Sequence, residues 1–567
     1  MALSWKVGAG TEVVATLERL REVLLGLRGI DPEEAAGFFL PEYDSTIHAP
    51  LLMRGMRRAV DRLFAAREAG ERVLVYGDYD ADGVTATALL VTVLRKLGIQ
   101  VIPYLPHRLE DGYGLNRRAL ERLLPEFDLL ISADCGISNA EEIAYLASRG
   151  KDVIIVDHHE LPAHLPSAFA ILHPRLPSYP FPYLSGAGVA FKLAQGLLRD
   201  ARARRVGEAH DEHALLDLAA LGTIADVVPM LGENRAIARF GLSMLGRRSR
   251  VGLSCLLSEC RLAQGKAVTA QDAAFRLLPR LNAAGRMDHP QPALDLLLTQ
   301  SAQQARDLVL RLNAYNSERQ IVTRRVMAEA RGQVDPASPF VFVASTDWPA
   351  GVLGLAAAKL AEEFAKPAIV VGGAGDGAVG SARAGSGANV LQILELGRTH
   401  LLRLGGHTRA AGFSLTPASI PRFHQALRKA YGGLSARAPA AVVADAWVDH
   451  SLLSWDLLEL IESFAPFGEG NQEPVFVARG LPVLDARVVG KSKDHLKLKL
   501  AAGSEAVDAI GFGLAQARKE VGRRIDALFT VETNEFGGRR QLSLKLREIA
   551  PAGRVRVQVG DAGHAVH

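Results

Sequence analysis

The sequence predicts a multidomain α/β protein in which a parallel-sheet lobe and a smaller α/β lobe are joined by a long helix and followed by a β-barrel. Three observations predict this fold class. The chain has 567 residues, enough for three or four domains at roughly 150 residues each. Hydrophobic residues make up 48% and charged residues 23%, which is the balance of a globular protein. The first third alternates short β-branched runs with longer helical patterns, as parallel βαβ units do.

The composition excludes several classes of protein. Lys and Arg total 66 and Asp and Glu 62, a net charge of +4, so any nucleic-acid contact must come from local basic patches. The three cysteines, Cys135, Cys255 and Cys260, are too few for a disulfide framework and lack CxxC spacing. No apolar run approaches the roughly 18 residues needed to cross a bilayer. We therefore expect a cytoplasmic protein that makes no contact with a membrane.

The parallel sheet is expected to hold four strands, which are VLVYG at 73–77, VIPYL at 101–105, DLLISA at 128–133 and VIIVD at 153–157. Helices are expected between them at 84–97 and 116–124. Ligands of such sheets collect at the carboxyl ends of the strands. Three of these ends are acidic, namely Asp78-Tyr79-Asp80-Ala81-Asp82, Asp134 and Asp157-His158-His159.

Three acidic loops at one sheet edge would repel each other without cations, and this predicts a metal site. An EF-hand calcium loop also opens D-x-D-x-D-G, but its twelfth position needs Glu, and this chain has Leu89 there. A solvated acidic turn explains one such loop better than three. Carboxylates and imidazoles without a thiolate series favour Mn²⁺ or Mg²⁺. Four or more carboxylates match a site for two ions.

The neighbouring side chains suggest further roles. Adjacent His158 and His159 are not expected to point the same way from an extended strand. One is therefore expected to bind metal, and the other to contact phosphate or transfer a proton. Cys135 is interpreted as a packed thiol rather than a nucleophile, because no base is paired with it.

Beyond the first lobe, residues 299–331 read as a long connecting helix that Pro336 ends. A second α/β unit follows, with strands at 340–345 and 368–373 and a glycine-rich return, GGHTRAAGFSL, at 405–415. Its glycines indicate close backbone approach to a ligand. After a helix near 454–464, six short β-like runs predict a small barrel of the OB type.

Taken together, the motifs resemble the DHH phosphoesterase superfamily and its RecJ branch. The superfamily motifs are GDYDADG, SADCG, Asp157-His158-His159 and LGTIADVVPM, and those of the branch are LPHRLEDGYGL, LSGAGVAFKL, RLNAAGRM and GGHTRAAGFSL. The similarity extends from about Leu51 to Leu415, with an OB-like region after it. It implies a 5′→3′ exonuclease of DNA recombination and repair that degrades single-stranded DNA to 5′-mononucleotides by hydrolysis with two Mn²⁺ or Mg²⁺ ions.

The resemblance also implies a division of the chain. The expected parts are an N-terminal extension (1–45), a DHH catalytic domain (46–298), a connecting helix (299–335), a DHHA1 domain (336–435), an OB-fold domain for nucleic acid (445–552) and a C-terminal tail (553–567).

By resemblance, the metal ligands are Asp78, Asp80, Asp82, Asp134, His158 and Asp226. Of these, Asp80, Asp82 and Asp134 are also assigned to catalysis, together with His159 beside the scissile phosphate. Asp217 remains an alternative to Asp226, which is preferred because it follows the small residue Ala225. Family II pyrophosphatases of the same superfamily have a histidine where this chain has Tyr76, which argues against pyrophosphate as the substrate.

The predicted substrate-binding residues lie in RLNAAGRM and in the second lobe. They are Arg280, Arg286, Ser381, Arg383, Gly406, His407 and Arg409. Guanidinium groups and exposed backbone N–H groups suit phosphate oxygens. Solvated arginines in a glycine-rich turn are the alternative in the second lobe, and structural salt bridges are the alternative for Arg280 and Arg286. The chain departs from the family's WHxGVxG pattern at Trp348-Pro349, so any role of a histidine there is lost.

On the barrel, four lysines are predicted to follow a DNA backbone, namely Lys491, Lys493, Lys497 and Lys499. Ordinary solvated lysines are the alternative. Gly490-Lys491-Ser492 is not a phosphate loop, because Asp485 stands where the first glycine of that motif belongs.

Two other functions remain open: a small-molecule phosphatase or oligoribonuclease, and a replication scaffold that has lost its metal ligands. The extra barrel disfavours the first, and the intact ligand set disfavours the second. The expected partners are single-stranded DNA, a single-strand-binding protein and a RecQ-type helicase, with the chain itself a monomer.

Overall fold

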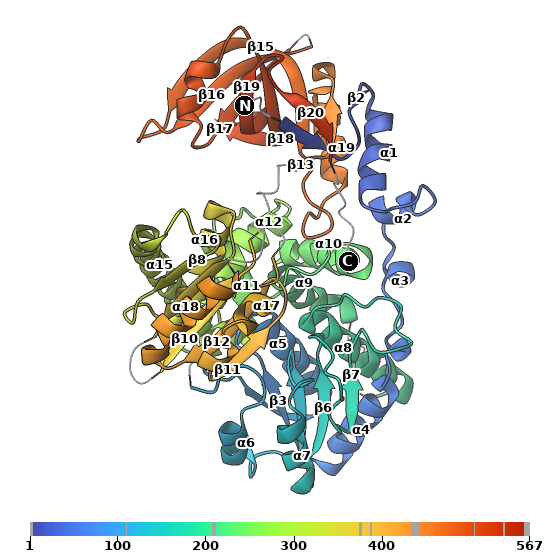
Figure 1. Cartoon of the computed structure of the whole chain (residues 1–567). Coiled ribbons are helices and arrows are strands. Elements are labelled where there is room, and N and C mark those ends of the chain that lie inside the picture. Colours follow the sequence, from blue (N-terminus) through green and yellow to red (C-terminus); the bar gives the residue numbers. More distant parts are fainter. Residues whose placement is uncertain are drawn as a thin grey trace.

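The computed structural model describes residues 4–108, 110–206, 211–373, 377–385, 388–431, 443–503, 505–536 and 539–560. They form two α/β lobes and a unit built on a β-barrel, which lies above the lobes in Figure 1. We call residues 43–298 the first lobe, residues 341–431 the second lobe, and residues 443–560 together with 4–39 the C-terminal unit. The predicted fold class is confirmed.

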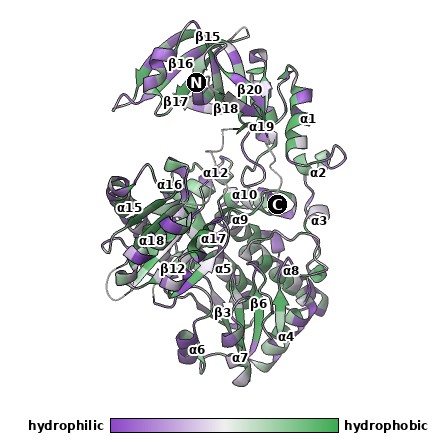
Figure 2. Cartoon of the chain, in the orientation of Figure 1, coloured by the Kyte–Doolittle hydropathy of each residue, from purple (hydrophilic) through white to green (hydrophobic). Residues whose placement is uncertain are grey.

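The first lobe contains a fully parallel sheet with the strand order β4-β3-β5-β6-β7. Its strands are β3 (Arg72–Gly77), β4 (Gln100–Tyr104), β5 (Leu129–Ala133), β6 (Asp152–Val156) and β7 (Ala170–Leu172). Four of them match the predicted strands. The sequence did not predict β7, because three residues are too few to show a period. The strands are largely hydrophobic (Figure 2), as expected for a sheet covered on both faces.

Helices cover both faces of this sheet. They are α4 (Met56–Ala69), α5 (Ala81–Lys96), α6 (Arg117–Leu123), α7 (Ala140–Ser148), α8 (Gly186–Arg204) and α9 (Leu216–Ala225). Helices α6 and α7 pack on one face, and α4, α5 and α8 on the other. Helix α5 is buried from Ala81 to Val91, because α8 and α9 cover its other side. The start of α5, directly after β3, is therefore enclosed.

The rest of the first lobe is helical, with α10 (Gly232–Arg247), α11 (Val251–Glu259), α12 (Ala270–Asp272), the π-helical turn Ala273–Leu277, α13 (Leu278–Met287) and α14 (Gln291–Leu298). Helix α15 (Ala302–Gln333) then leads to the second lobe. Helix α15 is the predicted connecting helix, and its 32 residues span about 48 Å. It packs along α11, α13 and α14. No helix in the described parts of the chain is long and apolar enough to cross a membrane.

The second lobe has a mixed sheet with the strand order β11-β12-β10-β9-β8, in which only β8 and β9 run parallel. Its elements are β8 (Val341–Ala344), α16 (Ala350–Phe364), β9 (Ala368–Gly372), β10 (Ala378–Arg383), α17 (Val390–Glu395), β11 (Arg403–Gly406), β12 (Ala410–Leu415) and α18 (Ile420–Tyr431). Strands β8 and β9 correspond to the two predicted strands. The glycine-rich return forms the β11–β12 hairpin.

The C-terminal unit contains a closed five-stranded barrel. Its strands are β15 (Phe476–Val489), β16 (His495–Ala502), β17 (Glu505–Gly511), β18 (Arg524–Phe536) and β19 (Arg539–Pro551). They pair in the order β15-β16-β17-β19-β18, and β18 pairs with β15 to close the barrel. Along β16, Leu496, Leu498 and Leu500 are buried and alternate with outward-facing residues. This is the predicted OB-type barrel.

Both ends of the described chain join this unit. Strand β1 (Ser4–Val7) lies between β13 (Val443–Ala444) and β20 (Arg556–Val559), parallel to both. Strand β2 (Val13–Val14) pairs with β14 (Ala446–Val448). Helices α1 (Leu17–Leu27) and α2 (Ala35–Phe39) share a hydrophobic core with α19 (Trp455–Ser463). Part of the segment expected to be an extension therefore completes the C-terminal unit.

Two buried arginines contact residues 464–473, which we call the junction loop. Arg235 joins this loop to the first lobe, and Arg28 joins it to the N-terminal part of the C-terminal unit. Arg235 of α10 donates to the carbonyl oxygens of Phe464 (2.7 Å) and Pro466 (3.3 Å). Arg28, after α1, donates to Asn471 Oδ1 (2.6 Å). Burial lowers the pKa of Arg28 to about 10 and that of Arg235 to about 9. Because burial removes water from both guanidinium groups, their N–H groups depend on these oxygen atoms as hydrogen-bond acceptors.

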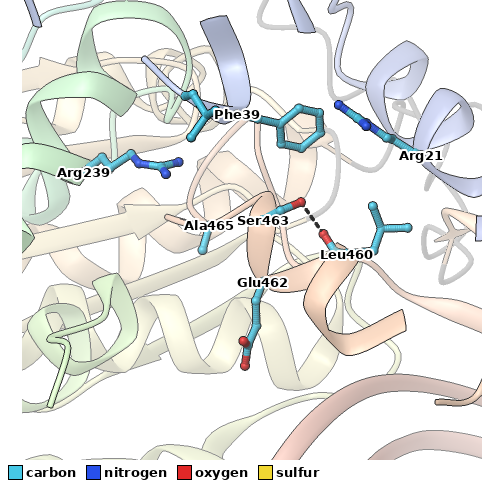
Figure 3. A pocket seen from close by; sticks show the side chains of 8 residues that line it. Arg21, Phe39, Arg239, Leu460, Glu462, Ser463 and Ala465 are labelled. Carbon is cyan, nitrogen blue, oxygen red and sulfur yellow. Dashed lines mark hydrogen bonds between the residues drawn. The ribbon is translucent and has the colours of Figure 1, made fainter. Parts of the chain in front are cut away.

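A pocket of about 340 Å³ opens beside this junction, between α1, α2, α10 and α19. Figure 3 shows Arg239 and Arg21 on opposite sides of it, with Phe39 between them. Arg21 lies over the Phe39 ring at 4.4 Å. Arg239 lies one helical turn after Arg235, yet it lines the pocket instead of reaching the carbonyl oxygens. It is therefore a matched control for Arg235.

We predict that Arg235→Ala loosens the junction, whereas Arg239→Ala does not. Removing the Arg235 guanidinium leaves the buried carbonyl oxygens of Phe464 and Pro466 with the Asn471 amide as their donor and breaks the contact to the first lobe, at a cost of about 2 kcal/mol. Hydrogen exchange measured by mass spectrometry should speed up in α19 and the junction loop, and the thermal unfolding midpoint should fall. Equal effects of the two substitutions would contradict the role assigned to Arg235.

Candidate metal centre

The acidic residues predicted as metal ligands meet at the carboxyl edge of the first-lobe sheet. Asp78 and Asp80 follow β3, Asp82 lies in the first turn of α5, Asp134 follows β5, and His158 and His159 follow β6. Asp226 comes from the end of α9. Three overlapping sets have ligand atoms within 4.8 Å of one another: Asp78, Asp80 and Asp134; Asp82, His158 and Asp226; and Asp134, His158 and His159.

His158 lies at the middle of this cluster. Its Nε2 atom is 3.2 Å from Asp134 Oδ1, 3.5 Å from Asp226 Oδ2 and 4.0 Å from Asp82 Oδ2. One imidazole nitrogen therefore faces carboxylates from three different elements. Asp134 belongs to two of the three sets, which is the position of a residue that bridges two ions.

The geometry also separates Asp226 from its rival Asp217. Both residues lie at α9, but Asp217 accepts two hydrogen bonds from Arg250, at 3.0 and 3.2 Å. Its carboxylate is thereby neutralised away from the cluster, whereas Asp226 faces His158. The structure brings Asp226 into the site and leaves Asp217 outside it.

Helix starts and glycines shape the cluster. Asp80 caps α5 by accepting from the N–H groups of Asp82 and Gly83, and Asp82 accepts from the first N–H groups of α8, at Gly186 and Ala187. A Cβ atom on Gly186 would lie 2.3 Å from Asp134 Oδ1. The helix must therefore approach the carboxylates at a glycine, which explains part of the LSGAG motif.

The donor set fits divalent cations. Three buried polar atoms of the cluster have no hydrogen-bond partner, namely Asp78 Oδ1, Asp134 Oδ1 and His158 Nε2. Burial raises the pKa of Asp134 well above its usual range, and repulsion by Asp82 adds to the shift. Burial likewise raises the pKa of Asp82 and of Asp226 to about 7. Cations would supply both the missing partners and the missing positive charge.

The two histidines differ in protonation. Although burial disfavours charge at Asp157, hydrogen bonds from His159 and Ile137 lower the pKa of Asp157. Burial also opposes protonation of His159, but Asp157 Oδ1, 2.8 Å from Nδ1, raises the pKa of His159 to about 9. Burial and the neighbouring His159 lower the pKa of His158 to about 4. The His158 ring is therefore neutral near pH 7, as a metal-binding imidazole has to be, and the His159 ring is charged.

The expectation that the two rings point in different directions was wrong. Both reach Asp134, with His159 Nδ1 3.9 Å and His158 Nε2 3.2 Å from its Oδ1 atom. Alternation does not apply, because β6 ends at Val156 and both histidines lie in the loop after it. Cys135 beside them is buried, and burial raises the pKa of its thiol, in line with a packed side chain.

Cationic and polar groups face the acidic cluster. Arg383 Nη1 donates to Ser381 Oγ at 2.9 Å. Burial lowers the pKa of Arg286 to about 10, with repulsion by Arg108 adding to the shift and Asp80 opposing it. His407 lies close enough to Arg383 and His159 to interact electrostatically with both. The second lobe thus brings Ser381, Arg383 and His407 toward the first-lobe centre.

The remaining predicted substrate-binding residues make contacts within the protein. Arg280 donates to Asn313 Oδ1 at 2.6 Å and so joins α13 to α15 by a hydrogen bond to an amide, not by the salt bridge considered as the alternative to phosphate binding. Arg409 forms an ion pair with Glu469 at 2.9 Å. Gly406 has a left-handed φ of 135°, and a Cβ atom there would lie 2.5 Å from Ala410 O. Pro349, at the departure from the family pattern, caps α16.

The sequence analysis missed two residues of this site. Arg108, whose guanidinium lies 4.7 Å from the centre of the Tyr79 ring, belongs to the LPHRLEDGYGL motif, so its charge was available as a signal. Asn282, within RLNAAGRM, accepts a hydrogen bond from Ala81 N at 2.9 Å and so completes the cap of α5. Nothing in the sequence shows which helix an amide side chain reaches.

A cavity of about 640 Å³ lies beside the cluster. Val227, next to Asp226, forms part of its wall, as do Asn282 and Arg286 of α13, Leu355 of α16 and residues of the junction loop. The cavity therefore lies where the first lobe, the second lobe and the C-terminal unit meet.

The four predicted barrel lysines lie on or beside β16. Lys491 and Lys493 are in the exposed turn that precedes the strand, and Lys499 is exposed on it. Lys497 forms an ion pair with Asp508 at 2.8 Å. Phe512, 57% exposed, packs beside His495 at the start of β16, with the two ring centres 5.1 Å apart.

A parallel-sheet lobe with an Asp and His centre, faced by a second lobe that brings cations, defines the DHH class of phosphoesterase. The family models agree with this. Residues 72–223 match the DHH family, N-terminal domain, residues 338–433 match the DHHA1 domain, and residues 444–548 match the RecJ OB domain.

Whole-length comparisons give the family. The single-stranded-DNA-specific exonuclease RecJ of Thermus thermophilus is 38% identical over 85% of this chain and 71% of its own length. The protein of the same description from Bacillus subtilis is 36% identical over 93% and 67%. The crystal structure of RecJ in complex with Mn²⁺ from Thermus thermophilus matches with a TM-score of 0.81, at 28% identity, over 98% of this chain and 80% of that one. The chain belongs to the RecJ family.

We predict that Asp226→Asn lowers activity with little effect on stability, and that Asp217→Asn lowers stability with little effect on activity. The first removes a ligand and should lower turnover of single-stranded DNA in Mn²⁺ by at least about a hundredfold, with the melting temperature little changed. The second leaves the Arg250 charge without its partner and should lower stability by about 3 kcal/mol. The folded Asp217→Asn protein should keep most of its activity. The reverse pattern would assign the ligand to Asp217.

The raised carboxyl pKa values predict that cation binding depends on pH. Below pH 7, Asp82 and Asp226 hold protons that a cation has to displace, so affinity for Mn²⁺ should rise from pH 6 to pH 8 by about tenfold in total for each of the two carboxyl groups and level off above pH 7. Titration calorimetry in two buffers of different ionisation enthalpy measures that proton release directly. An affinity that stays constant over this range would contradict the assignment.

Proposed function

We propose that this protein is a 5′→3′ exonuclease that degrades single-stranded DNA to 5′-mononucleotides, using two Mn²⁺ or Mg²⁺ ions. The observation that carries the proposal is the cluster of Asp78, Asp80, Asp82, Asp134, His158 and Asp226, with three buried ligand atoms that lack partners. The RecJ relatives support the substrate, because they are described as specific for single-stranded DNA.

The cluster provides two sets of ligands. Asp78, Asp80 and Asp134 would hold one ion, and Asp82, Asp226 and His158, with Asp134 between the sets, would hold the other. When bound, a pair of such ions activates water and stabilises an in-line displacement at phosphorus. Oxygen ligands with one or two imidazoles suit Mn²⁺ and Mg²⁺, in line with the Thermus thermophilus RecJ crystal structures in complex with either ion.

The protein's own side chains orient the strand. Arg383 and Ser381 offer donors for phosphate oxygens from the second lobe. The Asp157 carboxylate holds the proton of His159 at Nδ1, which leaves the Nε2–H group of the charged ring to donate to the scissile phosphate. Asn282 and Gly285 keep α13 against the loop that carries Asp78 and Asp80, since a Cβ atom on Gly285 would lie 2.6 Å from Tyr79 O.

The barrel extends the grip on the strand. Lys491, Lys493 and Lys499 are exposed and can each neutralise a phosphate, whereas Lys497 is already paired with Asp508. This arrangement favours a polymer over a dinucleotide, and the match to the RecJ OB domain supports it. The oligoribonuclease alternative has no use for such a barrel. A scaffold without catalysis would not need the unpartnered buried ligand atoms.

The wider setting is also a proposal. A role in DNA recombination and repair follows from the RecJ family. We further propose that the chain acts in the cytoplasm as a monomer, on strands presented by a RecQ-type helicase or held by a single-strand-binding protein. Co-sedimentation of the purified components would test the partners.

The function is tested with oligonucleotides labelled internally and blocked at one end. A biotin–streptavidin block at the 5′ end should stop hydrolysis in Mn²⁺, whereas a block at the 3′ end should not. The products should be mononucleotides from the first time point, and a fully paired duplex should resist. Internal fragments or attack from the 3′ end would overturn the proposal.

We predict that Arg383→Ala reduces the preference for a 5′-phosphate over a 5′-hydroxyl end by about tenfold, because a charge-assisted bond to the terminal phosphate is lost. Arg280→Ala serves as the matched control, since Asn313 already holds its guanidinium. The measurement is a competition between strands with either end. An unchanged preference in Arg383→Ala would place the phosphate pocket elsewhere.

A further inference from the structure

The ion pair between Arg409 and Glu469 joins all three parts of the molecule. Arg409 Nη1 lies 2.9 Å from Glu469 Oε1, and Arg409 belongs to the glycine-rich hairpin of the second lobe. Glu469 lies in the junction loop of the C-terminal unit. Its backbone oxygen accepts a hydrogen bond from Met230 N of the first lobe at 2.7 Å. Met230 is the last residue of the short segment 226–230, which begins at the candidate ligand Asp226.

On the side of the first lobe the junction loop is held firmly. Asn471 is fully buried and donates to the carbonyl oxygens of Phe464 and Pro466, the same two atoms that accept from Arg235. A Cβ atom on Gly468 would lie 3.0 Å from the Met230 side chain. The loop therefore presents the Glu469 carboxylate at a fixed place beside the metal centre.

On the side of the second lobe the contact is exposed. The side chain of Arg409 is 76% exposed and that of Glu469 is 34% exposed. An ion pair open to water in this way contributes at most about 1 kcal/mol, so another anion can replace the carboxylate at little cost. Arg409 lies two residues from His407, and the Arg409 N–H donates to the His407 ring. Glu469 also lines the cavity of about 640 Å³ beside the cluster, so the pair lies next to that cavity.

We propose that Glu469 occupies the phosphate-binding position of Arg409 until a strand enters, when a backbone phosphate replaces its carboxylate. This inference rests on the proposed function. It adds that the Glu469 carboxylate competes with other anions for the Arg409 guanidinium, so that weakly bound anions are kept out. A guanidinium accepts carboxylate and phosphate oxygens in the same geometry, so the exchange needs no rearrangement of Arg409. A phosphate that is part of a strand held at several points displaces the carboxylate more readily than a free phosphate does.

Glu469→Gln is a clean test of this exchange. It removes the charge and leaves the backbone oxygen that Met230 N contacts, so the loop is expected to fold as before. The probe is a 5′-phosphorylated strand of about 20 nucleotides with phosphorothioate linkages, which resist hydrolysis. Its binding in Mn²⁺ is followed by fluorescence anisotropy over a range of salt concentrations.

We expect Glu469→Gln to tighten binding about threefold at low salt and to steepen the plot of log Kd against log salt by up to about 0.7, the value of one phosphate contact. Arg409→Gln should weaken binding. In the Arg409→Gln background the Glu469→Gln substitution should have no effect, because its action passes through Arg409. Glu462→Gln, which alters an exposed pair with Arg540 at 3.5 Å, is the matched control and should change nothing.

The outcomes separate the two proposals. If Glu469→Gln tightens binding equally with and without Arg409, its charge acts only by general repulsion, and the exchange is refuted. The same holds if Glu462→Gln has an equal effect, or if Glu469→Gln has none. If the wild-type protein fails to bind the strand at all, the proposed function falls, and this inference falls with it.

Discussion

Mutual repulsion among carboxylates buried at one sheet edge is the constraint on which the rest of the first lobe depends. The side chains of Asp78, Asp82 and Asp134 are almost fully buried. The first N–H groups of α5 and α8, the positive ends of two helices, meet Asp80 and Asp82 and offset part of this repulsion. They do not reach Asp134 Oδ1, which has no partner. The glycines of α8 and α9, the cap from Asn282 and the left-handed backbone at Asp134, with φ of 64°, all serve to hold this cluster together.

Negative and positive side chains lie on opposite sides of the candidate metal centre. The first-lobe sheet edge supplies carboxylates, while Arg108, Arg286 and Arg383 supply positive charge. Burial lowers the pKa of Arg286 and of Arg383, and repulsion by Arg108 adds to both shifts. Either cluster alone is repulsive. Cations relieve the first and an anion relieves the second, and a phosphodiester bound to divalent cations brings both kinds of charge. The Asp157 carboxylate already has partners, because it accepts hydrogen bonds from Ile137 N and from His159. These contacts also fix the charge of that histidine.

The sequence predicted those parts of the site that regular geometry determines. Carboxyl ends of parallel strands meet at one edge, so three acidic strand ends predicted a cluster there. Side-chain direction on helices was not predictable in the same way. Asp217 and Asp226 are nine residues apart, about half a turn out of phase at 100° per residue, so only one of them can face the site, and the sequence does not say which. Strand β1 was not foreseen because it is four residues long and its partners lie more than 430 residues away along the chain.

The junction loop contacts the two lobes in different ways, through buried hydrogen bonds to the first and an exposed ion pair to the second. Its contacts to the first lobe are hydrogen bonds from Arg235 and from Met230 N, two buried residues, while Asn471 holds the loop together from within. Losing one of these hydrogen bonds costs more than losing an exposed ion pair. Its ion pair to the second lobe is exposed, and solvent can replace either member. A change in salt or the arrival of a polyanion therefore acts on the second contact and not on the first. The segment from Asp226 to Met230 is therefore tied to the junction loop by a contact of a buried residue, whereas the second lobe is tied to it by an exposed contact that an anion can exchange.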